Sequence, residues 1–443
     1  MKALTARPGA QRRPIRPPAA PALHADDMAE GADVLHEHPG PAGVPLWSAL
    51  RDFMLWVETP AHERAGLFAP GAGELRRAGL PALQAEPELW APLLTLAQMT
   101  DAPARADRAR LVHAVRSLAR WAERKGTPGT RLAFTTAVAQ ALPDQPSAAL
   151  EAARQARDLA RHAQAETWFR RAIRLARGSD WESYAWGFIG LGVLYRLAGN
   201  HPAARAVVSR ALRTARKRRL RDVAGAAHHH LFVFTSDAGQ IDEAYQHANA
   251  AMRAYGPTHP RVPALAHDLG VLWVNRGEFD RALPVLEATL PVLGSTADRV
   301  MVLANVARAT AAVGLRARYQ RARAEVMAVI EEPQFVSVAA EALLILAHGD
   351  SSVGEWALAE DTARRAAEIA DARGEAMVRT LAEAQVDAAR AEKKLGSLDA
   401  VVDRASRPAE AEVEPEFLVA RADTLALEVY AALGRHARHT AGA

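Results

Sequence analysis

The chain has no cysteine, which excludes disulfide bonds and metal sites built on thiolates. Aromatic residues make up 6% of its 443 residues, and only five of the 55 basic residues are lysine, a bias that we attribute to GC-rich coding. No uninterrupted apolar run approaches the ~20 residues that a membrane helix needs. The first 43 residues lack the apolar core of a secretion signal, because prolines interrupt them. These absences predict a cytoplasmic protein without a membrane segment.

Positive charge is concentrated at the N-terminus. The first 25 residues carry five basic residues and no acid, whereas the whole chain has a net charge of +4, so the remaining residues sum to −1. Residues 1–43 are rich in proline, alanine and charge and show almost no periodicity, which predicts a disordered arm. Such an arm either stays solvated or touches phosphate or an acidic partner.

Strand patterns are absent, because no alternating stretch is bounded by hairpin turns. Between residues 44 and 146 the apolar residues recur at helical spacing, which predicts an N-terminal helical region. Its helices are expected from Pro45 to Pro60 and near 86–99, 104–125 and 129–142, with loop or irregular helix over 60–85. From Ser147 to the end, the pattern predicts six or seven helical pairs, and Asp180 and Asn200 are expected to cap helix N-termini.

Seven glycines recur 37 to 42 residues apart in the repeat region. An apolar or small residue stands eight positions before each glycine, and in most units a small residue stands five positions after it. This register predicts hairpins of two helices in which glycine ends the first helix in a left-handed conformation. The glycines are Gly199, Gly239, Gly277, Gly314, Gly354, Gly396 and Gly434.

One copy of the register resembles the tetratricopeptide repeat, whose first helix reads W-x2-L-G-x2-Y and whose second reads A-x3-F. Its matching residues are Phe188, Leu191, Gly192, Tyr195, Ala204 and Val208. The resemblance, of bacterial type and to no specific member, covers residues 147–443. It implies an all-α fold, a right-handed α-α superhelix, with a protein or peptide held on the concave face.

Two departures from the family pattern carry information. The period exceeds the typical ~34 residues while the hairpin spacing stays fixed, which places the extra residues between units. Around Gly314 the register slips, because Tyr319 stands where the other units have a small residue, and we expect a lengthened turn or altered stacking there. In the last pair, the apolar surface of Phe417, Leu418, Leu425 and Val429 is either an ending cap or a dimer contact.

The resemblance places the binding groove on the first helix of each pair. Counting from the apolar residue eight positions before each glycine gives a lining that is apolar in its first half and basic in its second. The lysines and asparagines with which chaperone-type members clamp a terminal carboxylate are missing from the matching positions. The lining comprises Trp186, Ile189, Val193, Arg196, His229, Val233, Asp237, His267, Val271, Asn275, Arg308, His348, Arg390 and Lys393.

Catalytic motifs are absent: there is no phosphate-binding loop, nucleophile elbow or H-E-x-x-H motif. Three consecutive histidines, His228, His229 and His230, diverge by ~100° per residue on a helix and do not converge on one metal. We expect His228 to pack inward and His229 to face the groove. The glycines Gly187 and Gly190 are expected to thin their helix so that a neighbour approaches closely.

The sequence therefore predicts a non-enzymatic scaffold or adaptor that binds a protein or peptide and uses no cofactor or metal. A regulator of transcription or signalling that responds to a peptide is the alternative, although residues 44–146 show no clear helix-turn-helix module. A helical-repeat RNA reader is disfavoured by the near-neutral body and the apolar half of the groove. The partner and the oligomeric state are not determined.

Overall fold

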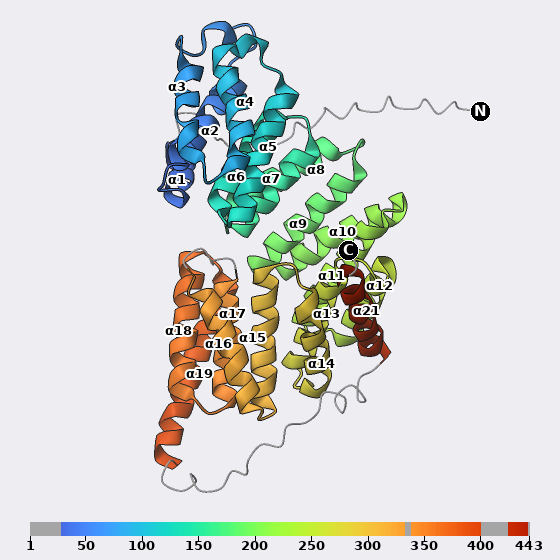
Figure 1. Cartoon of the computed structure of the whole chain (residues 1–443). Helices are drawn as coiled ribbons and strands as arrows, with labels where there is room; N and C mark the ends of the chain where they lie inside the picture. The colour runs from blue at the N-terminus through green and yellow to red at the C-terminus, as the bar shows by residue number, and fades with distance from the viewer. Residues whose placement is uncertain (1–27, 333–337, 400–423, 442–443) are drawn as a thin grey trace, which may run out of the picture.

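The computed structural model describes residues 28–332, 338–399 and 424–441. These residues form 20 α-helices and five short 3-10 helices, and none of them forms a strand. The helices follow one another as a right-handed α-α superhelix, which curves into an arc (Figure 1). The predicted all-α fold is confirmed.

The N-terminal helical region contains six helices around a continuous apolar core. Its largest fully buried side chains include Phe53, Trp56 and Phe134. Residues 60–85, expected to be loop or irregular helix, contain one short helix, α3, and short 3-10 segments. The helices are α1 (Met28–Glu37), α2 (Gly43–Glu58), α3 (Ala72–Ala78), α4 (Trp90–Asp101), α5 (Arg108–Lys125) and α6 (Pro128–Ala141).

Helix α1 lies inside the range that was predicted to be a disordered arm, and for residues 28–37 that prediction is wrong. The Glu37 carboxylate accepts hydrogen bonds from the backbone N–H groups of Gly129 and Thr130, at 2.8 and 2.7 Å, at the N-terminus of α6. An anion is stabilised there by the free N–H groups and the helix dipole. Val34 of α1 is fully buried. This tertiary docking orders a segment whose own periodicity is weak.

Six helical pairs follow, and their N-caps and turns agree with the sequence. The side chains of Asp180 and Asn200 accept hydrogen bonds from backbone N–H groups three residues later. The pairs are α7 (Pro146–Asp158) with α8 (His162–Ala176), α9 (Trp181–Leu197) with α10 (His201–Arg218), α11 (Arg221–Asp237) with α12 (Ile241–Tyr255), α13 (Val262–Asn275) with α14 (Phe279–Thr289), α15 (Thr296–Ala312) with α16 (Arg316–Ile330), and α17 (Ala339–Ser352) with α18 (Trp356–Ala372).

Five glycines close these hairpins in one geometry. Their φ angles lie between +71° and +85°, and the residue after each donates to the carbonyl five positions earlier, at 2.7–2.9 Å. This bond is that of a Schellman motif. The glycines are Gly199, Gly239, Gly277, Gly314 and Gly354. The other two predicted turns are wrong, because Gly396 lies within α19 (Ala376–Asp399) and Gly434 within α21 (Thr424–Ala441).

The register slip at Tyr319 changes the stacking and leaves the turn unchanged. Helix α16 begins two residues after Gly314, as α10 begins two residues after Gly199, so the predicted lengthened turn is wrong. The predicted altered stacking is confirmed, because α17 packs mainly on α15 and hardly on α16, whereas α11 packs mainly on α10. Tyr319 is buried between these helices and its hydroxyl donates to the carboxylate of Asp350.

Helix α21 does not continue the array beyond α19. It packs against α13 and α14, in the middle of the array, where Figure 1 shows it in dark red. Leu425 and Val429 are buried in this contact, so this part of the apolar surface forms an intramolecular contact, which neither sequence-based alternative included. Phe417 and Leu418 lie outside the described residues.

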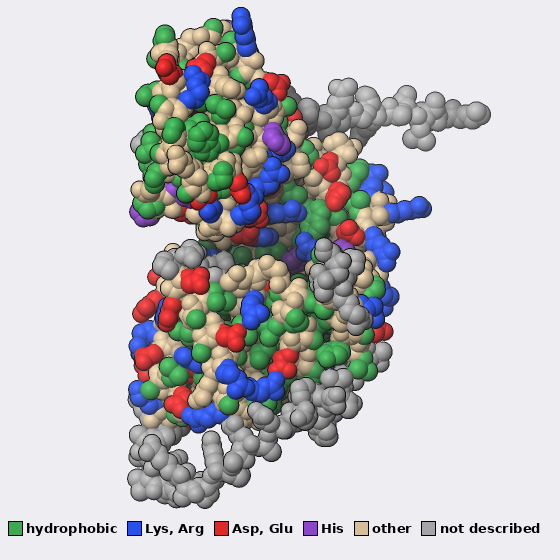
Figure 2. Space-filling model, in the orientation of Figure 1, with side chains coloured by type: hydrophobic (Ala, Val, Ile, Leu, Met, Phe, Trp, Pro, Cys, Tyr) green, Lys and Arg blue, Asp and Glu red, His purple; other side chains and the backbone are tan. Residues whose placement is uncertain are grey.

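The arc brings helices that are far apart in sequence close to one another. A cavity of about 690 Å³ lies between the α5–α8 part of the chain and the N-terminal ends of α15, α17 and α19. Val193 and Leu197 of α9 also line it. Figure 2 shows the hollow between these two parts of the molecule. The first helices of the pairs therefore face the inside of the arc.

Candidate functional site

A row of side chains at one register position runs along the inner face of the first helices. Each stands two positions after the apolar residue of its unit and is half-buried, and we call this row the ridge. Three successive members are valine and the next two are basic. From α9 to α17 the members are Val193, Val233, Val271, Arg308 and His348.

The ridge begins one unit earlier than the sequence indicated. In the first pair, Ala160 has φ +57° and occupies the turn position that glycine holds elsewhere. Counting back from Ala160 places Arg154 of α7 at the ridge position, and its side chain is half-buried. The sequence analysis missed Arg154 because alanine replaces the glycine that marks the register.

Two predicted groove residues lie between helices and do not line the groove. Ile189 is 3% exposed and His229 is 8% exposed. The imidazole of His229 bonds to the Asp268 carboxylate at 2.8 Å, and His267 lies 3.4 Å from the other oxygen of Asp268. Burial opposes ionisation of Asp268, but hydrogen bonds from these two histidines outweigh it and hold its pKa well below its usual range. This cluster ties α11 to α13.

Polar pairs also link neighbouring first helices at the open side of the ridge. Arg196 of α9 donates to Asp237 of α11 at 2.7 Å, and Arg308 of α15 donates to the Asn275 amide oxygen of α13 at 2.8 Å. Four predicted groove residues are therefore paired across neighbouring helices. They fix the spacing of the first helices and so the shape of the groove.

The predicted aromatic residue of the groove, Trp186, lies between two arginines. The guanidinium carbons of Arg154 and Arg261 lie 5.3 and 4.9 Å from its ring centroid. Cation–π attraction at these distances positions both side chains. Arg154 has no hydrogen-bonded carboxylate, and burial together with the nearby Arg157 and Arg261 lowers its pKa. Neither arginine was a candidate in the sequence analysis.

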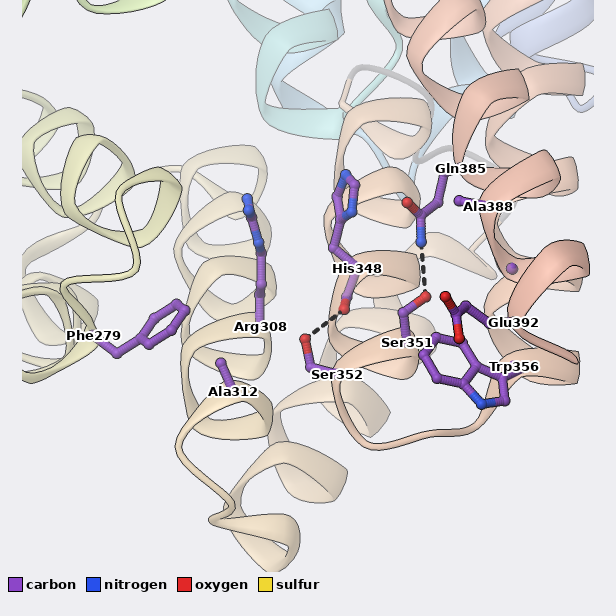
Figure 3. A pocket seen from close by; sticks show the side chains of 11 residues that line it. Phe279, Arg308, Ala312, His348, Ser351, Ser352, Trp356, Gln385, Ala388 and Glu392 are labelled. Carbon is purple, nitrogen blue, oxygen red and sulfur yellow. Dashed lines mark hydrogen bonds between the residues drawn. The ribbon is translucent and has the colours of Figure 1, made fainter. Parts of the chain in front are cut away.

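At the far end of the ridge, Arg308 and His348 point side by side from α15 and α17 (Figure 3). They line a pocket of about 290 Å³ together with Ser351, Gln385 and other residues of α14, α17, α18 and α19. Burial lowers the pKa of Arg308 with no opposing contribution from a carboxylate. Burial and the neighbouring Arg308 lower the pKa of His348 to about 4. At neutral pH this pocket holds one guanidinium beside an uncharged imidazole.

The predicted basic end of the groove does not extend to Arg390 and Lys393. Both side chains are exposed and both reach the Glu360 carboxylate of α18, at 2.9 and 3.5 Å. Their charge is therefore compensated by the neighbouring second helix. Within the described residues of the array, the basic end of the ridge is formed by Arg308 and His348.

The histidine run behaves as three separate residues. His228 is buried, as expected: its Nε2 accepts from Arg216 at 3.0 Å, so its Nδ1 donates to the Nδ1 of His247 at 2.9 Å. His230, and not His229, is the more exposed residue of the run. No group of three or more His, Asp or Glu residues in the described parts of the chain is arranged to hold a metal ion.

The buried His228 predicts a loss of stability in acid. Burial, followed by His247 and Arg216, lowers its pKa from 6.5 to about 4. The unfolded chain then binds more protons than the folded chain between these values, so this contribution is complete above pH 6.5 and lost as the pH falls toward 4. We expect this residue to lower the unfolding free energy by about 1 kcal/mol between pH 7.5 and 5.5. Urea unfolding at the two pH values tests this, and an equal loss in His228→Gln would contradict it.

No described helix is long and apolar enough to cross a membrane. In comparisons with known proteins, a model of the tetratricopeptide repeat family matches residues 144–217. No curated protein sequence matches the chain.

Three solved structures are similar to it. A chain of the APC/C hetero-tetramer Cut9–Hcn1 shows 12% identity and a TM-score of 0.42, over 81% of this chain and 69% of that one. Rap protein complexed with Competence and Sporulation Factor shows 11% identity and a TM-score of 0.37, over 84% and 99%. BtubC from P. vanneervenii shows 17% identity and a TM-score of 0.29, over 69% and 98%. The family match and the glycine-closed hairpins together identify residues 144–217, from α7 to α10, as tetratricopeptide repeats.

Proposed function

We propose that this protein is a non-enzymatic scaffold that binds a protein or peptide segment along the ridge of its concave groove. The observation that carries the proposal is the row of half-buried valines, Val193, Val233 and Val271, at one register position on three successive first helices. Apolar side chains repeated along a concave surface present a line of contacts to an extended partner.

The surroundings of the valines favour a protein segment over other ligands. The cross-helix pairs Arg196–Asp237 and Arg308–Asn275 leave the valines on one continuous polar-edged strip. A nucleic acid needs a positively charged track for its phosphates, whereas the middle of this ridge is uncharged. A peptide that alternates between apolar and polar side chains satisfies both parts of the strip.

Selection from a displayed library of random sixteen-residue peptides, followed by fluorescence anisotropy with the selected peptides, tests this proposal. Val233→Arg places a charge in the middle of the ridge and is expected to weaken binding at least tenfold, because the arginine must be desolvated against apolar groups of the peptide. Val313→Arg is the matched control, since Val313 is 39% exposed in the turn between α15 and α16.

Binding that is equally strong in Val233→Arg would contradict the groove as the binding surface. Failure to select any peptide, together with retention of mixed-sequence single-stranded RNA that weakens as salt rises, would replace the peptide by a nucleic acid.

A further inference from the structure

The ridge has a charge pattern that is symmetrical about its apolar middle. From α7 to α15 its members are Arg154, Val193, Val233, Val271 and Arg308. Each terminal arginine lacks a hydrogen-bonded carboxylate, although most of the ion pairs in the described residues join an arginine to one. Half-buried guanidinium groups without an anion are electrostatically unsatisfied.

Carboxylates elsewhere on the inner face do not neutralise these two arginines. Asp237 is paired with Arg196, and Asp268 is held by His229 and His267. Glu341 stands in the first turn of α17, about two turns before His348, and lines the cavity between the two parts of the arc. The charge that each end of the ridge presents to a partner is therefore positive.

The spacing of the ridge matches one peptide conformation. Packed helices lie roughly 9 Å apart, so the four steps from α7 to α15 span about 36 Å. A polyproline II segment presents every third residue on one face, with a repeat of about 9.3 Å, and twelve residues of it span about 37 Å. Same-face residues repeat after about 5.4 Å in an α-helix and after about 6.6 Å in a β-strand, so neither keeps step with the first helices.

We propose that the groove selects an extended, polyproline II-like segment with a carboxylate at each end and three apolar residues between them, at every third position. The two carboxylates are twelve residues apart, and each forms a charge-assisted hydrogen bond with Arg154 or Arg308. At the second end, the uncharged imidazole of His348 and the pocket that it lines with Ser351 receive the carboxylate (Figure 3). This inference rests on the proposed function and defines the chemistry of the partner.

Synthetic thirteen-residue peptides test the pattern directly. The reference peptide carries glutamate at its first and last positions, leucine at the fourth, seventh and tenth, and alternating proline and alanine elsewhere. Replacing either glutamate with glutamine is expected to weaken binding about tenfold, because a hydrogen bond to a charged group is lost. A peptide with the two glutamates only nine residues apart is expected to bind as weakly as the singly substituted peptides.

Variants of the protein locate the two ends. Arg308→Gln and Arg154→Gln are each expected to abolish the preference for glutamate at one end only. Arg308→Glu is expected to prefer a peptide with lysine at that end, an outcome that misfolding does not produce. Arg390→Gln is the matched control, because that arginine is already compensated by Glu360.

Equal binding of the glutamate and glutamine peptides, or a preference that is unchanged in Arg308→Glu, would overturn the inference. Library-selected peptides that depend on Val233 but contain no paired acids would overturn it as well, while leaving the proposed function intact. Selection of peptides with acids twelve residues apart, lost in Arg154→Gln, would support both.

Discussion

Replacing Asp350 with alanine is expected to lower the unfolding free energy of the α15–α18 part by about 3–5 kcal/mol. The Asp350 carboxylate is fully buried and accepts hydrogen bonds from the Tyr319 hydroxyl, from Nε of Arg323 at 2.8 Å and from the Thr362 hydroxyl at 2.8 Å. The alanine variant leaves the Arg323 guanidinium, 19% exposed, without its anion inside the protein. Breaking a buried pair from one side is destabilising because a charge stays buried and uncompensated.

Hydrogen exchange of α16, α17 and α18 measures this effect locally, which suits a repeat array whose parts unfold separately. Asp361→Ala is the matched control, because that carboxylate is 71% exposed and pairs only with Arg364. We expect a change below about 0.5 kcal/mol in the control. Tyr319→Phe removes one neutral donor and is expected to lower stability by about 1 kcal/mol. Unchanged exchange in Asp350→Ala would show that the network does not hold these helices together.

Replacing Gly190 with alanine is expected to lower the unfolding free energy by about 3 kcal/mol. A methyl group at this position would lie 2.1 Å from the ring of Phe169, which is fully buried in α8. Alanine favours a helix by ~1 kcal/mol over glycine, so the helix alone would gain stability. The steric overlap is the larger effect, because the ring has no free volume into which it can move.

Urea unfolding of three variants separates the two effects. Gly294→Ala is the control, since nothing lies within 4 Å of the added methyl group. The double variant Gly190→Ala with Phe169→Leu is expected to be more stable than the sum of the two single changes predicts, because the smaller side chain vacates the overlapping volume. Additive losses in the double variant would indicate that the α8–α9 contact is not the origin of the effect.

The close approach of α8 and α9 was predictable from the sequence because it depends on local composition. Gly187 and Gly190 thin one face of α9, as expected, and a methyl group on Gly187 would lie 2.6 Å from Ile173 of α8. The hairpin turns were predictable for the same reason, since a glycine with positive φ acts within its own turn. Where a glycine lies within a long helix, as Gly396 does, its spacing alone was misleading.

The candidate groove was only partly predictable. Register placed Val193, Val233 and Val271 on the inner face correctly, but it also included Ile189 and His229, which are buried between helices. Depth between two helices depends on how far each pair rotates against the next, and no residue within a unit encodes that rotation. The same limit applies to Arg390 and Lys393, whose charge is compensated by a carboxylate of the preceding helix.

The sequence by itself determined the helical class, the hairpin register and the chemical alternation of the ridge, because each depends on residues within about 20 positions of one another. The tertiary structure alone decided three further features. It ordered α1 through the Glu37 carboxylate at the N-terminus of α6, placed α21 on α13 and α14, and left Arg154 and Arg308 without carboxylates. These features depend on contacts between distant segments, whose free energy is set by burial and charge pairing across the fold and not by local propensity.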